Sequence, residues 1–120
     1  MDLSTKIVGI AVKSLEEKKA EDLRILDISQ VSTLADYFLI TNGRNRNQLQ
    51  AMADDVEEKL AKAGIMVKHK EGYDEAAWIL MDYGDVVLHL FDRENREFYQ
   101  LEKIWADAQN VDKTDFEGLE

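Results

Sequence analysis

The chain has 120 residues, 45% of them hydrophobic and 33% charged, which is enough apolar sequence for one domain with its own core. It contains no cysteine, and this excludes a disulfide framework and any zinc site built on cysteine. Twenty-five acidic and fifteen basic residues give a formal net charge of −10, which opposes non-specific binding to nucleic acid and favours a basic partner.

The first part of the chain predicts a helix followed by two strands. An apolar stripe over residues 7–15 has helical spacing, and Ser4 or Thr5 is the expected N-cap. Residues 23–28 predict a short strand, and residues 36–43 predict a second strand that ends in residue types typical of a turn.

A second helix is predicted after Asn45. Asn45 and Gln48 have the spacing of a capping box, an apolar stripe runs from residue 49 to residue 60, and Gly64 follows the last turn as a C-terminal cap. Residues 65–70 then predict a third strand.

Residues 77–83 and 86–91 predict a hairpin, because Gly84-Asp85 between them is a two-residue turn signal. Side chains alternate across a sheet, so one face of this hairpin is almost wholly apolar and is expected in the core. Its predicted pairs are Tyr83 with Val86, Met81 with Leu88 and Ile79 with Leu90. The other face is either covered incompletely by a helix or open to a partner. It carries Trp78, Leu80, Asp82, Val87, His89 and Phe91.

Asp92 can cap a final helix that has apolar side chains on one side. These are Phe98, Leu101, Ile104 and Trp105. Residues 108–120 are acidic and predict a frayed tail, which leaves residues 1–107 as the domain. The predicted architecture is a single α/β domain, in which one mixed sheet with packed helices follows the order α-β-β-α-β-β-β-α.

Several residues on the open face of the hairpin have two interpretations. Trp78 is either a partly buried packing residue or an anchor for a partner, since tryptophan is over-represented among interface hot spots. His89 fits a hydrogen-bonded strand histidine better than a general base, because no motif supplies a reaction centre. Asp85 serves turn geometry, and Asp82 either caps a backbone amide or accepts a hydrogen bond from a basic partner.

The remaining motifs do not indicate an enzyme. Gly43 is a lone glycine before a helix, without a phosphate-binding loop, and Arg44 and Arg46 are too few bases for a nucleic-acid stripe. Asp54 and Asp55 are adjacent on a helix and point about 100° apart, as on a solvated face. The sequence therefore predicts no catalytic residue, no metal and no cofactor.

The sequence also carries no targeting signal for export or for membranes. The first residues lack the charged and apolar regions of a signal peptide. No run of residues approaches the roughly 18 apolar residues of a membrane span. We therefore expect a cytoplasmic protein that does not bind membranes.

Several segments resemble the ribosomal silencing factor (Iojap-like) family. They are Asp36 to Ile40 leading to Gly43, Glu71-Gly72, Trp78, Asp82 to Val87, His89, Arg96 to Tyr99, Leu101-Glu102 and Trp105. The resemblance covers roughly residues 4–107. The segment from Trp78 to Phe91, combined with the closing helix, is specific, whereas the helical stripes alone are not.

The resemblance implies an α/β fold related to the nucleotidyltransferases, without their catalytic elements. It also implies a translation repressor that binds the large ribosomal subunit through large-subunit ribosomal protein fourteen, obstructs joining with the small subunit and lowers translation when nutrients are short. By position it assigns the contact surface to Trp78, Asp82, Tyr83 and Tyr99, although the hairpin register puts Tyr83 on the core side. The acidic charge fits a basic protein better than direct, specific binding to RNA.

Two other functions stay open at this point. A nucleotidyl-transfer enzyme on the same fold would need a Gly-Ser element and an Asp-x-Asp or Asp-x-Glu pair that holds divalent metal. Here Gly43 is followed by Arg44, and Asp82 and Asp85 are separated by a turn. The third function is an interaction module for an unrelated basic protein. Affinity and oligomeric state, including a homodimer, do not follow from the sequence.

Overall fold

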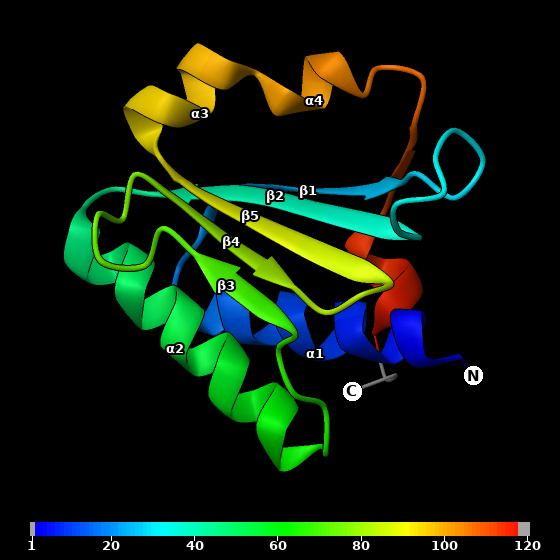
Figure 1. Ribbon diagram of the computed structural model, residues 1–120, viewed down its shortest axis with the longest axis horizontal. Coiled ribbons are helices and arrows are strands. Elements are labelled where there is room, and N and C mark those ends of the chain that lie inside the picture. Colours follow the sequence, from blue (N-terminus) through cyan, green and yellow to red (C-terminus); the bar gives the residue numbers. More distant parts are fainter. Residues whose placement is uncertain (1, 118–120) are drawn as a thin grey trace.

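The computed structural model describes residues 2–117 of the chain (Figure 1). Its elements are α1 (Leu3–Glu17), β1 (Glu21–Asp27), β2 (Tyr37–Gly43), α2 (Arg46–Lys62), β3 (His69–Glu71), β4 (Trp78–Asp82), β5 (Val86–Asp92), α3 (Arg93–Tyr99), α4 (Leu101–Ile104), β6 (Gln109–Val111) and the 3-10 helix η1 (Lys113–Phe116). The predicted order of elements is found as far as β5. Beyond β5 the predicted final helix is divided in two, and a sixth strand follows.

The strands form one mixed sheet in the order β3-β4-β5-β2-β1-β6. Strands β2 and β5 are parallel, and the other neighbouring pairs are antiparallel. Helices α1 and α2 cover one face of the sheet, whereas α3 and α4 lie on the other (Figure 1). This arrangement confirms the predicted α/β class with a mixed sheet and packed helices.

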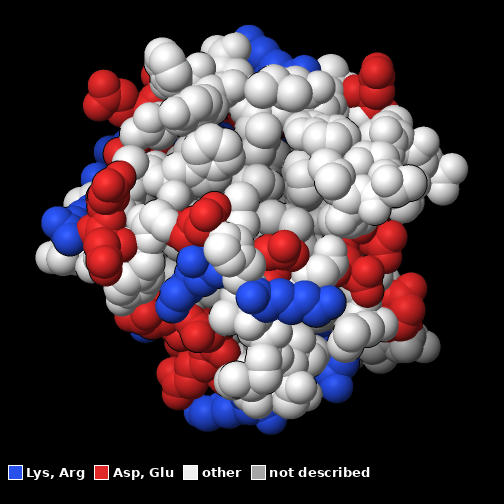
Figure 2. Space-filling model, viewed as in Figure 1, with Lys and Arg blue, Asp and Glu red and all other residues white. Residues whose placement is uncertain are grey.

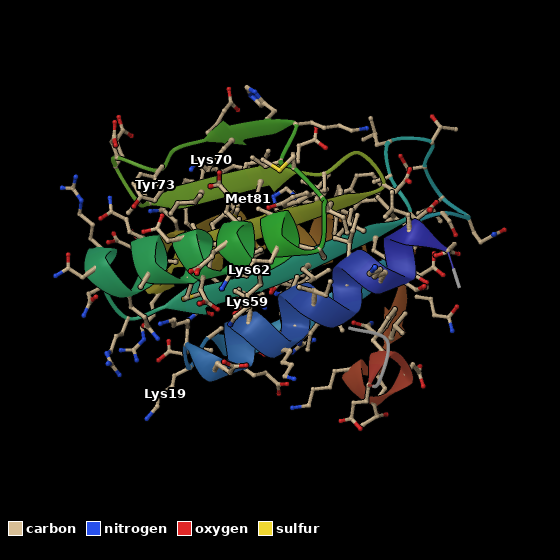
Figure 3. All side chains as sticks on the ribbon, turned by 90° about the horizontal axis from the view of Figure 1, so that it is seen from below. Lys19, Lys59, Lys62, Lys70, Tyr73 and Met81 are labelled. Carbon is tan, nitrogen blue, oxygen red and sulfur yellow. The ribbon has the colours of Figure 1, made fainter. Side chains whose placement is uncertain are left out.

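The larger hydrophobic core lies between the sheet and the helices α1 and α2, which run side by side (Figure 3). The two helices are also joined by polar contacts. The Ser14 hydroxyl of α1 donates to Asp55 Oδ2 of α2 at 2.5 Å, and Lys59 Nζ lies 3.0 Å from the same oxygen. At the start of α2, Asn45 Oδ1 accepts a hydrogen bond from the Gln48 backbone N–H at 2.8 Å, as the capping pattern predicted.

The hairpin of β4 and β5 has the register that the sequence predicted. Ile79 is paired with Leu90 and Met81 with Leu88, and the Tyr83 backbone N–H donates to the Val86 carbonyl at 2.9 Å. All six side chains of this face are buried in the larger core. The prediction held because the side-chain period of a strand is two, so the position of the turn fixes both faces.

A second, smaller core lies on the face of the sheet that α3 and α4 cover. Its buried residues are Leu26, Ile28, Ala35, Phe38, Ile40, Phe91, Leu101 and Ala108. Trp78, Val87 and Trp105 pack against it and are partly buried. The mixed face of the hairpin therefore contributes to this core and is only partly covered by the short helices.

Two predicted boundaries in the first part of the chain are corrected by the structure. The N-cap of α1 is Asp2, whose Oδ1 accepts from the Thr5 backbone N–H at 2.9 Å, instead of Ser4 or Thr5. A carboxylate accepts this hydrogen bond as well as a hydroxyl does, so the spacing alone did not distinguish the candidates. Within the predicted strand 65–70, only the last two residues belong to β3, which runs to Glu71. Of the preceding residues, Ile65 and Val67 pack partly buried against the larger core, whereas Met66 is exposed.

The predicted final helix is interrupted at Gln100, which has a left-handed backbone with φ of 45°. The interruption separates α3 from α4 and turns the apolar side chains in different directions. Leu101 is buried, but Phe98 and Ile104 are 75% and 70% exposed. The prediction that these side chains lie on one side of a single helix is therefore wrong, because a left-handed residue breaks the helical period.

Residues 109–117 belong to the segment that the sequence predicted to be a frayed tail, and in the structure they include β6 and η1, which contact the rest of the fold. Strand β6 pairs antiparallel with β1, and η1 packs beside α1. Phe116 is 4% exposed, and its ring meets the edge of the Tyr37 ring at a centroid distance of 5.5 Å. The acidic composition suggested solvation, but pairing of β6 with β1 and burial of Phe116 dock this segment on the fold. Residues 118–120 lie outside the described part of the chain.

The docking of η1 predicts a stability effect for Phe116→Ala. Loss of a buried phenylalanine costs about 3 kcal/mol or more in a rigid core. Because a terminal segment can detach without global unfolding, we expect about 2 kcal/mol here. Urea unfolding monitored by circular dichroism measures the change. Asp115→Ala, at an exposed neighbouring position, is the control and should change little. Equal stability of both variants would contradict the docking.

Candidate functional site

Trp78 lies at the start of β4, on the sheet face that carries α3, and its side chain is partly buried. Its ring packs against the rings of Tyr99 and Phe91, each at a centroid distance of 4.9 Å. Its indole N–H donates a hydrogen bond to His89 Nδ1 at 3.2 Å. Trp78 is thus fixed from three sides, and one part of it remains open to solvent.

Two exposed aromatic side chains of α3 continue from Trp78: Tyr99 contacts the Trp78 ring, and Phe98 contacts Tyr99. Tyr99 is 42% exposed and Phe98 is 75% exposed, and their rings meet edge to face at a centroid distance of 5.0 Å. We call Trp78, Phe98 and Tyr99 together the aromatic surface. On the face seen in Figure 2, uncharged side chains form a white area towards the top, where α3 and α4 lie, with charged side chains around its margin. Exposed aromatic groups of this kind mark contact sites for other molecules.

Asp82 lies at the opposite end of β4 from Trp78, on the same face of the strand. The two residues are four positions apart along the strand, which corresponds to about 13 Å. The Asp82 Oδ1 atom accepts a hydrogen bond from the Gly84 backbone N–H at 2.7 Å, in the tight turn where Gly84 has φ of 90°. Asp82 therefore stabilises the turn through one oxygen, and it stands beside the aromatic surface instead of within it.

Tyr83 does not belong to this surface, which corrects the prediction that grouped it with Trp78, Asp82 and Tyr99. Its side chain is 4% exposed and points into the larger core on the opposite face of the sheet. Burial raises the pKa of its hydroxyl, and this oxygen has no hydrogen-bond partner among the described residues. The alternation of the strand decides the outcome, because the position after Asp82 faces the other way.

His89 lies under the aromatic surface as part of its support. It is 5% exposed, and its ring is 4.7 Å from that of Phe38. Its Nδ1 accepts from Trp78, and its Nε2 has no hydrogen-bond partner among the described residues. Burial lowers the pKa of His89 to about 4, so the ring is neutral at neutral pH. A neutral, enclosed imidazole positions Trp78 and offers no base to a substrate.

This histidine predicts a pH dependence of stability. The unfolded chain binds the His89 proton with a pKa near 6.5, whereas the folded chain binds it only near 4. Unfolding therefore takes up a proton, and stability falls as the pH drops from 6.5 towards 4. The limit of this loss is roughly 3 kcal/mol. His89→Gln keeps an acceptor for Trp78 but does not titrate, so its unfolding free energy should fall less over that range. If the unfolding free energies of the wild type and His89→Gln fell equally over that pH range, His89 would not be the group responsible.

The described residues do not assemble the elements of nucleotidyl transfer. Among residues 2–117, no group of three or more His, Asp or Glu side chains is arranged to hold a metal ion. Gly43 serves packing, since a Cβ there would lie 3.1 Å from Gln48 Oε1. The same Gln48 oxygen accepts from the Arg44 backbone N–H at 2.7 Å, so the start of α2 is occupied by its own side chain.

A groove of about 430 Å³ between the C-terminal halves of α1 and α2 lies on the far side of the sheet from Trp78. Lys59 and Lys62 line it and are seen on α2 in Figure 3. No residue of the aromatic surface contributes to this groove. Of the predicted site residues, Trp78, Asp82 and Tyr99 reach an open surface outside this groove, whereas Tyr83 is buried. An open surface suits a protein contact better than a small ligand.

Sequence reasoning missed the exposure of Phe98 and Ile104. Both were predicted to lie on the apolar side of one continuous final helix, together with Leu101 and Trp105. Gln100, whose left-handed conformation exposes them, is not one of the residue types that commonly mark such a break. No local sequence signal would have revealed it.

Residues 2–120 of the chain match the family described as "Ribosomal silencing factor during starvation". The chain belongs to this family. The match confirms the resemblance and runs past residue 107 into the segment that the sequence predicted to be a tail. Membership places the protein among ribosome-associated regulators of translation. Within the described part of the chain, no helix combines the length and the apolar character needed to cross a membrane.

Individual ribosomal silencing factors are similar over most of the chain. The ribosomal silencing factor RsfS of Bacillus subtilis (strain 168) is 45% identical over 106 residues, which are 88% of this chain and 90% of the relative. A crystal structure of a Chromobacterium violaceum protein has a TM-score of 0.84 and 31% identity, covering 93% of this chain and 92% of that one. A crystal structure of a Bacillus halodurans protein has a TM-score of 0.77 and 39% identity, covering 86% and 93%.

Proposed function

We propose that this protein represses translation by binding the large ribosomal subunit and obstructing its joining with the small subunit when nutrients are short. The proposed contact is large-subunit ribosomal protein fourteen. The observation that carries the proposal is the aromatic surface of Trp78, Phe98 and Tyr99, exposed on a member of the ribosomal silencing factors. We include Asp82 in the contact surface and leave Tyr83 out.

The physical chemistry of this surface suits a protein partner. Tryptophan and tyrosine present large, rigid, partly polar groups at a low cost in conformational entropy, and they are frequent interface hot spots. Asp82 keeps a second carboxylate oxygen that can accept a hydrogen bond from a basic residue. The net charge of −10 favours encounter with a basic ribosomal protein over direct contact with ribosomal RNA.

Steric obstruction requires binding and no chemical step. The proposal therefore assigns no catalytic residue, cofactor or metal to this chain, and it assumes that the protein acts in the cytoplasm, where ribosomal subunits join. The nucleotidyl-transfer function is not favoured by any contact in the described residues. A different basic protein, or a second copy of this chain, remains the competing occupant of the aromatic surface.

Co-sedimentation with separated ribosomal subunits tests the proposal. We expect the protein to pellet with large subunits and not with small ones, and to bind purified ribosomal protein fourteen in a titration. Sedimentation of the protein alone shows whether a homodimer covers the surface in the absence of ribosomes. Binding to neither subunit, or to the small subunit only, would contradict the proposal.

A further inference from the structure

Arg96 is the one buried side chain of α3. It is 6% exposed, whereas the aromatic neighbours Phe98 and Tyr99 on the same helix are 75% and 42% exposed. Surface helices usually dock on a sheet through an apolar stripe. Helix α3 meets the sheet through the Tyr99 ring, which lies against Trp78 and near Phe91, and also through the buried guanidinium group of Arg96. Its placement therefore depends in part on hydrogen bonds that have a defined geometry.

The Arg96 guanidinium connects α3 to three other elements. Its Nη1 donates to the Asp22 carbonyl of β1 at 2.9 Å and to Asn42 Oδ1 of β2 at 3.0 Å. Its Nε donates to Glu102 Oε2 of α4 at 2.9 Å. Its Nη2 makes no hydrogen bond among the described residues and lies 3.4 Å from Asp22 Oδ2. Because an unpaired buried charge is costly, this network favours a single position of α3.

Arg96 also spans the break between α3 and α4. Its backbone carbonyl accepts from the N–H of Gln100, the left-handed residue at the break, at 3.1 Å. Its side chain reaches past the break to Glu102. Both sides of the break are therefore tied to one residue. Tyr99, whose ring lies against Trp78, immediately precedes Gln100.

We propose that Arg96 is a positioning residue of the ribosome contact: it holds α3 so that Tyr99 and Phe98 stand beside Trp78, and it does not itself touch the partner. This inference rests on the proposed function. A surface that is held in its binding position loses less conformational entropy on association than a mobile one. The expected consequence is that loss of the Arg96 geometry lowers affinity although the aromatic side chains are unchanged.

Two matched variants test this role. Arg96→Lys keeps the charge but cannot make the forked hydrogen bonds to Asn42 and Glu102. Arg93→Lys is the control on the same helix, where the side chain is 63% exposed and pairs with Glu21. We expect Arg96→Lys to lower affinity for isolated large subunits roughly tenfold, and to speed amide hydrogen exchange in residues 93–104 but not in the central strands. Arg93→Lys should match the wild type in both measurements.

A double-mutant cycle with Tyr99→Ala tests whether Arg96→Lys lowers affinity by displacing Tyr99. If Arg96 acts by placing Tyr99, then Arg96→Lys should cost much less affinity in the Tyr99→Ala background than in the wild type. Full additivity would show that Arg96 acts elsewhere and would overturn the inference. Unchanged affinity of a folded Arg96→Lys protein would overturn it as well.

A replacement variant covers the case in which Arg96→Lys cannot be studied. If Arg96→Lys does not fold, Glu102→Gln replaces it, since this variant keeps an acceptor for Arg96 and removes only the charge of the pair. Glu102→Gln is then expected to lower affinity for large subunits and to speed amide hydrogen exchange in residues 93–104, both by less than Arg96→Lys would. If Glu102→Gln changed neither measurement, the inference would be overturned. A wild-type protein that does not bind large subunits would refute the proposed function. A wild type that binds, with Arg96→Lys equal to it, would refute only the role of Arg96.

Discussion

When the protein is added to separated ribosomal subunits, the formation of joined ribosomes is expected to fall strongly. When it is added to ribosomes that are already joined, the loss is expected to be much smaller. A protein that covers the joining face competes with the small subunit for the large one. Once the subunits have joined, that face is hidden, and simple occlusion provides no energy source to separate them.

Sucrose-gradient profiles after both orders of addition measure this effect. Excess small subunit should restore joining, because two ligands that exclude each other weaken each other's binding by the same factor. Magnesium and temperature must be chosen so that joined ribosomes do not exchange subunits during the assay. Equal inhibition in both orders under those conditions would reject occlusion, and would indicate either active splitting or a block at a later step of translation.

Trp78→Ala is expected to weaken binding of the folded protein to large-subunit ribosomal protein fourteen by about 1–3 kcal/mol, which is roughly a 5- to 150-fold loss of affinity. The variant removes the central ring of the aromatic surface. It also removes the packing against Tyr99 and Phe91 and the hydrogen bond to His89. Because Trp78 is only partly buried, the accompanying loss of stability should stay below the roughly 3–5 kcal/mol of a fully buried tryptophan.

Trp105→Ala is the matched control for this variant. Trp105 is the other tryptophan of the chain and is also partly buried against the smaller core, where its ring lies 5.2 Å from Phe38. It should lose comparable stability and much less affinity. Thermal melts and binding titrations, carried out well below both melting temperatures, separate the two effects. Unchanged binding by folded Trp78→Ala would remove Trp78 from the contact surface.

The candidate site was only partly predictable from the sequence. The hairpin turn at Gly84-Asp85 fixed which residues of β4 and β5 face the larger core, and it already opposed the inclusion of Tyr83 in the contact surface. The structure adds the partners that the sequence could not supply. Trp78 is positioned by His89 from β5 and by Tyr99 from α3, which are distant in sequence from one another and meet only in the folded chain.

By itself, the sequence determined the α/β class, the order of elements as far as β5 and the hairpin register. These features depend on local periodicity and turn chemistry, which act over a few residues. Only the tertiary structure decided that the last helix breaks at Gln100, that Phe98 faces solvent and that η1 docks through Phe116. These outcomes depend on contacts between distant segments, such as Arg96 with Asn42 and Phe116 with Tyr37, which no local pattern encodes.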